Sequence, residues 1–118
     1  MEITYHGEEG NHVAEIKAEG KIITEPQDVL DIMADCYFNG TNRLVMRKEN
    51  IAEDFFDLKT GIAGEILQKF STYGASLAII GDFNDVKSKS LRDFIYESNK
   101  TGRINFVASL EEAIESLS

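Results

Sequence analysis

The segment Ser76–Ile80 constrains the fold of this chain more than any other, because it is short and almost purely apolar. Such a run, without polar alternation, predicts a strand that is buried on both faces, as in a parallel sheet. The preceding residues 60–73 repeat apolar side chains at the spacing of one buried helix face, at Ile62, Ile66, Phe70 and Tyr73. We therefore expect a layered fold in which helices pack on a parallel sheet.

The rest of the chain extends this pattern in both directions. The N-terminal segments 2–6, 12–18 and 21–23 have strand character and are separated by turn residues, which predicts an antiparallel meander. In 12–18 the alternation places Ala14 and Ile16 on the core face and Glu15 and Lys17 on the other. Further strands are expected at 43–46 and 104–107, and further helices after Pro26, from Ser90 and over 110–117.

These elements predict one α/β domain over residues 1–118. Its sheet is mixed, with the antiparallel meander at the N-terminal side and parallel strands after it. Right-handed crossovers would place the helices mainly on one face. We expect Ser90 and Asp93 to form a capping box at the start of the third long helix, and Cys36 to be a small buried apolar residue.

Charge and composition exclude several kinds of partner. The net charge is −9, so the surface repels phosphate backbones, and we expect neither nucleic-acid binding nor docking on anionic membranes. Cys36 is the only cysteine, and the first residues lack the basic and apolar regions of a signal peptide. No apolar run approaches the roughly 18 residues of a membrane span, so we expect a cytoplasmic protein.

Common catalytic and metal-binding motifs are absent from the sequence. There is no GxGxxG, GxxxxGK[ST], HExxH, CxxC or GxSxG pattern. The acidic group Glu53, Asp54 and Asp57 lacks the spacing of an EF-hand loop. We therefore expect no cofactor, no bound metal and no enzymatic activity.

Two alternative functions depend on residues at the end of the buried strand. In open parallel sheets, ligands bind beyond the carboxyl ends of the strands, which is where Gly81 and Asp82 lie. A small-molecule pocket there could also use Ser88, Ser90 and Arg92 at the next helix start, although serines at that position more often cap the helix. The other alternative is an enzyme with a carboxylate site at Asp57 and Asp82.

Two segments carry a resemblance to a known family. They are FFDLKTGIAGEILQKF at 55–70 and SKSLRDFIYESN at 88–99. Both resemble a bacterial family that is catalogued as a domain of unknown function. More distantly, the order of elements is similar to the STAS domain of anti-sigma-factor antagonists and sulfate-transporter tails.

The STAS resemblance implies a non-catalytic regulatory or protein-interaction module with an unidentified protein partner. Its switch turn, which carries a phosphorylated serine, corresponds in position to Asp57, Lys59, Thr60 and Gly61. The turn here is one residue longer, and Thr60 stands where that serine would be. The alternative role for Asp57 and Thr60 is to cap the following helix. The sequence leaves the oligomeric state open.

Overall fold

The computed structural model of this protein describes residues 1–8 and 10–118. A mixed five-stranded sheet runs in the order β1-β2-β3-β4-β5. The first two strands are antiparallel and each later strand is parallel to its neighbour. The strands are β1 (Glu2–His6), β2 (Val13–Lys17), β3 (Arg43–Arg47), β4 (Ser76–Ile80) and β5 (Ile104–Val107).

Helices separate the parallel strands along the chain, and a last helix follows β5. They are α1 (Pro26–Phe38), α2 (Glu53–Phe56), α3 (Ile62–Thr72), α4 (Lys89–Thr101) and α5 (Leu110–Leu117). Two 3₁₀ turns, η1 (Lys48–Asn50) and η2 (Leu58–Thr60), lie in the long connection between β3 and α3. No helix in the described ranges has the length and hydrophobicity needed to cross a membrane.

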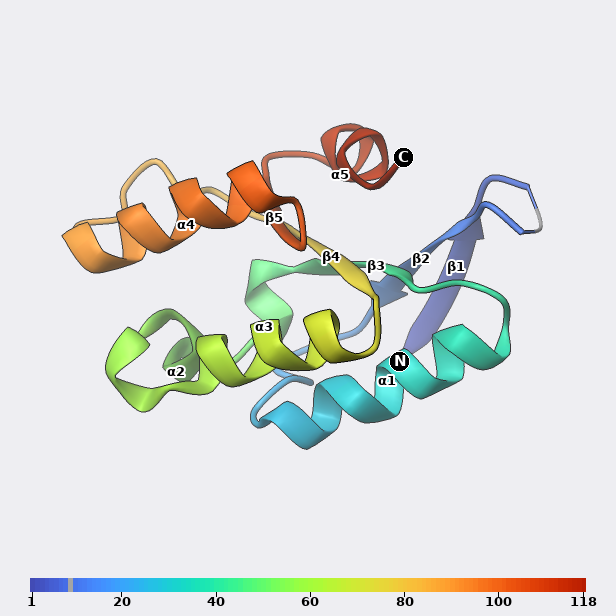
Figure 1. The fold of residues 1–118 in the computed structure, drawn as a ribbon, viewed down its shortest axis with the longest axis horizontal. Helices are drawn as coiled ribbons and strands as arrows, with labels where there is room; N and C mark the ends of the chain where they lie inside the picture. The colour runs from blue at the N-terminus through green and yellow to red at the C-terminus, as the bar shows by residue number, and fades with distance from the viewer. Residues whose placement is uncertain (9) are drawn as a thin grey trace.

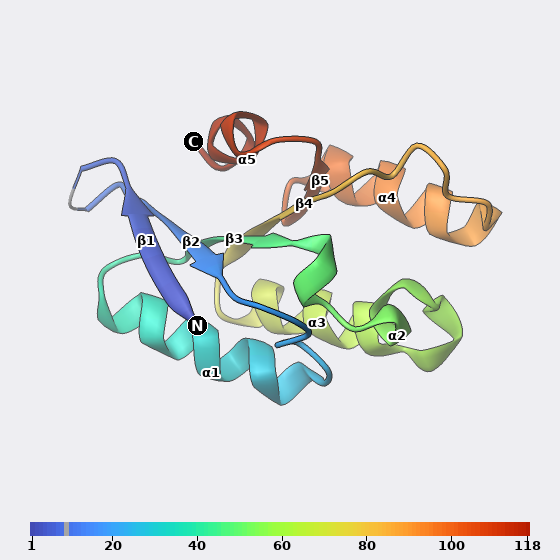
Figure 2. The same ribbon diagram turned by 180° about the vertical axis from the view of Figure 1, so that it is seen from behind.

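The strand order explains why most helices share one face of the sheet. Each parallel connection steps to the next strand in the same direction, so repeated right-handed crossovers return to the same side. α1 and α3 lie side by side below the sheet in Figure 1, and α5 lies above it (Figures 1 and 2). α4 packs against β5. The expected mixed α/β sheet with helices mainly on one face is confirmed.

The two faces of the sheet carry cores of unequal size. The larger core joins alternate strand residues to the helices α1, α2 and α3, with partly buried residues of α4 against it. Its fully buried side chains include Phe55, Phe70, Ile66, Leu44, Leu77 and Ile79. The smaller core lies under α5 and consists of Val13, Val45, Ala78, Ala113 and Leu117.

The expected third strand of the meander, at 21–23, does not form. Ile23 makes a single bridge, which is parallel and pairs with Ile51. The amides of Ile22 and Ile23 donate to the carbonyl of Asn50, and the Asn50 side-chain amide donates to the carbonyls of Ala18 and Gly20. The backbone amides of this segment are hydrogen-bonded to η1, so the segment does not continue the sheet as a third strand.

Two expected helix features also differ. Ser88, rather than Ser90, caps α4, since its Oγ accepts the Leu91 amide at 3.2 Å. Tyr73 is 60% exposed, although we expected it in the buried stripe of α3. The helix ends at Thr72, so the chain turns before Tyr73 can reach the core.

Candidate functional site

A buried carboxylate lies on the sheet face that α5 only partly covers. Ala14 and Ile16 point into the larger core, so strand alternation turns Glu15 to the opposite face. The side chain of Glu15 is only 2% exposed there. A buried ion is unfavourable unless other groups compensate its charge, so its neighbours decide what it can do.

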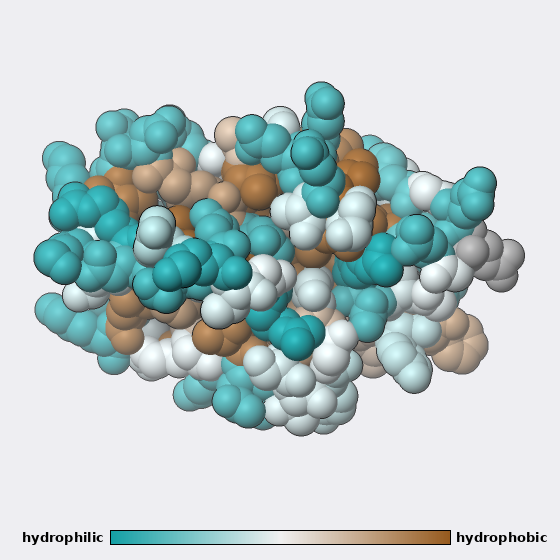
Figure 3. Space-filling model, turned by 45° about the horizontal axis from the view of Figure 1, so that its top comes forward, coloured by the Kyte–Doolittle hydropathy of each residue, from teal (hydrophilic) through white to brown (hydrophobic). Residues whose placement is uncertain are grey.

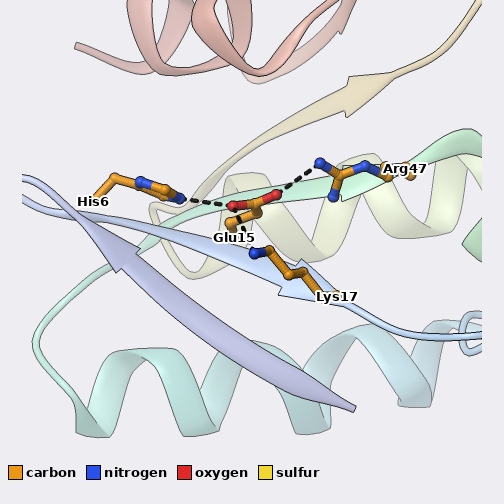
Figure 4. Close-up of polar contacts among 4 residues, drawn as sticks. All are labelled: His6, Glu15, Lys17 and Arg47. Atoms are coloured by element: carbon orange, nitrogen blue, oxygen red, sulfur yellow. Dashed lines mark hydrogen bonds and ion pairs between the residues drawn. The ribbon is translucent and has the colours of Figure 1, made fainter.

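Three side chains from three strands surround this carboxylate, and Figure 4 shows them converging on it. His6 Nε2 of β1 lies 2.7 Å from Glu15 Oε1, and Arg47 Nη2 of β3 donates to Oε2 at 2.7 Å. Lys17 Nζ, two residues along β2, is 4.0 Å from Oε1. We call these four residues the Glu15 cluster.

The partners hold Glu15 in its ionised form. Burial favours a raised pKa, but the hydrogen bonds from His6 and Arg47 and the charges of Arg47 and Lys17 outweigh it. The pKa of Glu15 is therefore below its ordinary value of 4.5. An ionised carboxylate has no proton to donate, and with both oxygens engaged and a lowered pKa it is also a weak base, so the arrangement favours a structural link between β1, β2 and β3.

This cluster was not predicted from the sequence. The strand alternation places Glu15 on the face away from the core, which is correct, but it does not indicate that Glu15 is buried there, at 1% exposure. The sequence contained one sign of the cluster, because Glu15 is an acidic residue that stands between apolar residues of its strand. Sequence alternation cannot supply the partner, because Arg47 arrives through the pairing of β2 with β3.

Gly81 and Asp82 lie where the sequence analysis placed them, at the carboxyl end of β4. Lys48 of η1 packs over Gly81, and its Nζ donates to the Asp82 carbonyl at 3.1 Å. The same ammonium lies 5.2 Å from the ring centre of Phe83 and 5.9 Å from that of Phe56. Two open hollows of about 340 and 360 Å³ flank this contact, and Gly81 and Asp82 line both.

The close approach of Lys48 gives Gly81 a testable role. A Cβ on residue 81 would lie 2.8 Å from Lys48 Cβ, so a side chain there forces a shift. We expect Gly81→Ala to lower the unfolding free energy by about 1–3 kcal/mol in urea denaturation. The matched control is Gly64→Ala in α3, where a Cβ meets nothing within 4 Å and should be neutral or stabilising. Unchanged stability of Gly81→Ala would contradict tight packing at this point.

The other residues considered for this pocket serve the start of α4. Ser88 caps the helix, and Ser90 is exposed. Arg92 Nη1 donates to the carbonyl of Val86 at 3.3 Å. Ser88, Ser90 and Arg92 therefore do not join Gly81 and Asp82 in the walls of the two hollows.

The turn that we compared with the STAS switch lies before α3, where Asp57, Lys59, Thr60 and Gly61 are exposed and Leu58 is half-buried. Thr60 Oγ1 lies 2.7 Å from the Asp54 carbonyl and 2.9 Å from the Asp57 carbonyl, and it accepts the Ile62 amide at 3.3 Å. Asp57 Oδ1 accepts the Lys59 amide at 3.2 Å. Gly61 has a φ of +78°, a conformation that favours glycine. Asp57 therefore caps η2, and Thr60 accepts the first amide of α3, whose N-cap residue is Gly61.

The two carboxylates of the alternative enzyme site serve separate turns. Asp57 accepts from Lys59 in the turn before α3, and Asp82 Oδ1 accepts the Asn84 amide at 3.0 Å after β4. Each therefore already has a local backbone partner. Within the ranges that the structure describes, no group of three or more His, Cys, Asp or Glu side chains is placed to hold a metal ion.

An apolar groove between α1 and α3 was not anticipated from the sequence. Its volume is about 590 Å³, and its walls include Leu30, Met33, Ala34, Tyr37, Tyr73 and Ala75. Tyr37 is 74% exposed. Tyr37 and Tyr73 both lie where their helices end, so the apolar stripes continue past the region that the sheet covers. We call this feature the α1–α3 groove.

The fold and these surfaces define an α/β protein with a mixed sheet, a helical layer on one face and a single helix on the other. Residues 8–117 match the family described as "Domain of unknown function (DUF4180)", and the chain belongs to that family. The expected family membership is confirmed. No curated protein and no solved structure is significantly similar to the chain.

Proposed function

We propose that this protein is a non-catalytic protein-interaction module that docks a partner through the α1–α3 groove. The observation that carries the proposal is the exposure of large aromatic side chains on the walls of an apolar hollow, Tyr37 at 74% and Tyr73 at 60%. Contiguous exposed apolar surface on a folded domain marks interaction sites. Tyrosine is enriched in such interfaces because its ring adds apolar area while its hydroxyl tolerates water.

The face over α4 and α5 differs in character. In Figure 3 hydrophilic side chains cover most of that face, and apolar atoms lie between them in separate patches. α5 adds the exposed carboxylates Glu111, Glu112 and Glu115. Such a charged surface keeps the protein in solution. Burying it against a partner yields less favourable free energy than burying apolar surface, so it is less suited to protein binding.

Regulation of the module is proposed at Thr60. The residue is exposed one position before Gly61, the N-cap of α3, and the same helix reaches the groove near Tyr73. A phosphate on Thr60 would add about −1.5 to −2 charges and would displace its hydroxyl from the Asp54 and Asp57 carbonyls. The nearby carboxylates of Asp54 and Asp57 would repel that charge, so the start of α3 would loosen.

Affinity capture from the native cell, read by mass spectrometry, tests the groove. Ala34 lies in the groove wall and is exposed, so Ala34→Glu introduces a charge there without entering the core. We expect the wild-type chain to retain a partner that Ala34→Glu loses at an unchanged melting temperature. Tyr96→Ala on α4 is the matched control, since Tyr96 is 64% exposed and lies outside the groove. Equal capture by Ala34→Glu and wild type would contradict docking in the groove.

The same capture experiment tests the switch. We expect Thr60→Glu to release the partner and Thr60→Ala to retain it, with equal melting temperatures for the two variants. If Thr60 only caps α3, both variants lose about 1 kcal/mol of stability and capture the same proteins. That second result would remove the regulatory part of the proposal and leave the docking groove in place.

A second candidate function is small-molecule binding beside Gly81. The observation in its favour is the Lys48 ammonium, which lies beside the rings of Phe56 and Phe83 at the carboxyl ends of β3 and β4. Ligands of open parallel sheets bind at that edge. A rise in melting temperature with a small anionic ligand, abolished by Lys48→Ala, would support this function. No shift with any member of a broad anion panel would contradict it.

A further inference from the structure

We propose that a second copy of this chain occupies the α1–α3 groove, in a two-fold symmetric dimer in which the Phe38 ring of each copy enters the groove of the other. The inference rests on the proposed function, because it names the partner of the same docking site. Three observations support it: a protruding ring beside a hollow, one acidic and one basic residue on opposite sides of the groove, and the amount of exposed aromatic surface.

The first observation is the placement of Phe38. Phe38 is 91% exposed and directly follows Tyr37, which lines the groove. Helical spacing of four places Phe38 on the same line of α1 as the wall residue Ala34. A two-fold interface uses the same patch on both copies, so it needs a projection and a complementary hollow side by side. Phe38 and the groove satisfy that condition.

The second observation is the charge carried by each helix. On α1, Asp31 is exposed and lies three residues before Ala34, so it borders the groove on that side. On α3, Lys69 lies four residues before Tyr73 and borders the other side. A two-fold axis across the groove brings α1 of one copy against α3 of the other. Each Asp31 then approaches the Lys69 of the second copy, so this one pair is complementary in charge.

The third observation is the exposed aromatic surface. Tyr37, Phe38 and Tyr73 are 74%, 91% and 60% exposed. With about 200 Å² for each aromatic side chain, they present roughly 450 Å² of removable surface. A standard interface buries about 800 Å² from each partner, so these rings supply more than half of it. The partly exposed Leu30 in the groove wall adds to that area.

Association of two copies through the β5 edge is less favourable than through the groove. The Asn99 side chain already pairs with that edge, since its Oδ1 accepts the Phe106 amide at 2.7 Å and its Nδ2 donates to the Phe106 carbonyl at 3.4 Å. An edge whose backbone groups have partners no longer offers a template for another strand. At Phe106, therefore, the β5 edge offers no free backbone groups to a second copy.

Sedimentation equilibrium of the full chain, from about 1 μM to 1 mM, tests the dimer. We expect a monomer–dimer equilibrium in this range for the wild type. Phe38→Ala removes both inserted rings and should weaken the dimer by about 100-fold or more, since buried aromatic anchors dominate interface energies. The matched control Tyr96→Ala removes a comparably exposed ring from α4 and should leave the equilibrium unchanged. Far-UV circular dichroism verifies that each variant is folded.

Charge reversal tests the geometry of the dimer. We expect Asp31→Lys and Lys69→Asp to weaken dimerisation separately and the double variant to recover it, because both charges then reverse across the interface. Double-variant recovery supports the two-fold arrangement, and its failure overturns it. A wild type that is monomeric at 1 mM, or a dimer that Phe38→Ala leaves intact, also overturns the inference. A monomer that still loses a captured protein on Ala34→Glu would overturn the second copy alone and keep the groove as a docking site.

Discussion

Replacing Ile66 by alanine is expected to lower the unfolding free energy by about 2–5 kcal/mol. Ile66 is 1% exposed and lies in the larger core, between Ala63 and Phe70 on the buried face of α3. Alanine leaves a cavity there, because the neighbouring side chains belong to a helix and a sheet that cannot both move to fill it. Urea denaturation with a linear extrapolation measures the loss.

Gln68→Ala is the matched control for that measurement. Gln68 is exposed on the same helix, and its Nε2 donates to Thr72 Oγ1 at 3.3 Å. Alanine is a good helix former and removes only this surface contact, so the change should stay within about 0.5 kcal/mol. A loss below about 0.5 kcal/mol for Ile66→Ala would mean that the buried face of α3 has been assigned incorrectly.

Replacing Arg47 by alanine is expected to cost about 3 kcal/mol. The change removes the hydrogen bond to Glu15 Oε2 and leaves an ionised carboxylate that is 2% exposed. Breaking a buried ion pair from one side typically costs about 3–5 kcal/mol, and we expect the lower end because His6 and Lys17 stay beside Glu15. The matched control is Lys17→Ala, since Lys17 is 48% exposed and 4.0 Å away, and it should cost less than about 1 kcal/mol.

The acid dependence of stability gives an independent measure of the same cluster. The folded pKa of Glu15 lies below its ordinary value of 4.5, so its stabilising contribution is complete above that pH. The contribution is lost as the pH falls below 4.5 toward the folded pKa, because only the unfolded carboxyl then binds a proton readily. We expect the stability difference between wild type and Glu15→Gln to shrink over this range. A constant difference between pH 7 and pH 3 would contradict the lowered pKa.

Together these variants separate two kinds of stabilisation in one sheet. Ile66 reports on the helical face, where burial of apolar surface provides the energy. Arg47 reports on the α5 face, where the smaller apolar core ends and the Glu15 cluster continues across β1, β2 and β3. If only Ile66→Ala destabilised the protein, the N-terminal hairpin would be held by backbone pairing rather than by its charges.

Local pattern was sufficient for most of the architecture. The apolar run at β4 and the helical spacing of Ile62, Ile66 and Phe70 depend on neighbours within one element. The constant direction of right-handed crossovers then fixed which face the helices share. The same local logic failed for 21–23, because the Asn50 carbonyl, distant in sequence, accepts the amides that a strand would have used.

The candidate sites also divide into those that the sequence located and those that only the tertiary structure assembled. The sequence alone located Gly81 and Asp82 at the carboxyl end of a buried strand and the exposed turn around Thr60, because both follow from where an element ends. Only the tertiary structure brought His6 and Arg47 to Glu15, and only helix packing joined Tyr37 to Tyr73 across the α1–α3 groove. Strand register and helix contact set these pairings. Both depend on how segments that are distant in sequence pack into one core, and the periodicity within a single segment does not encode that packing.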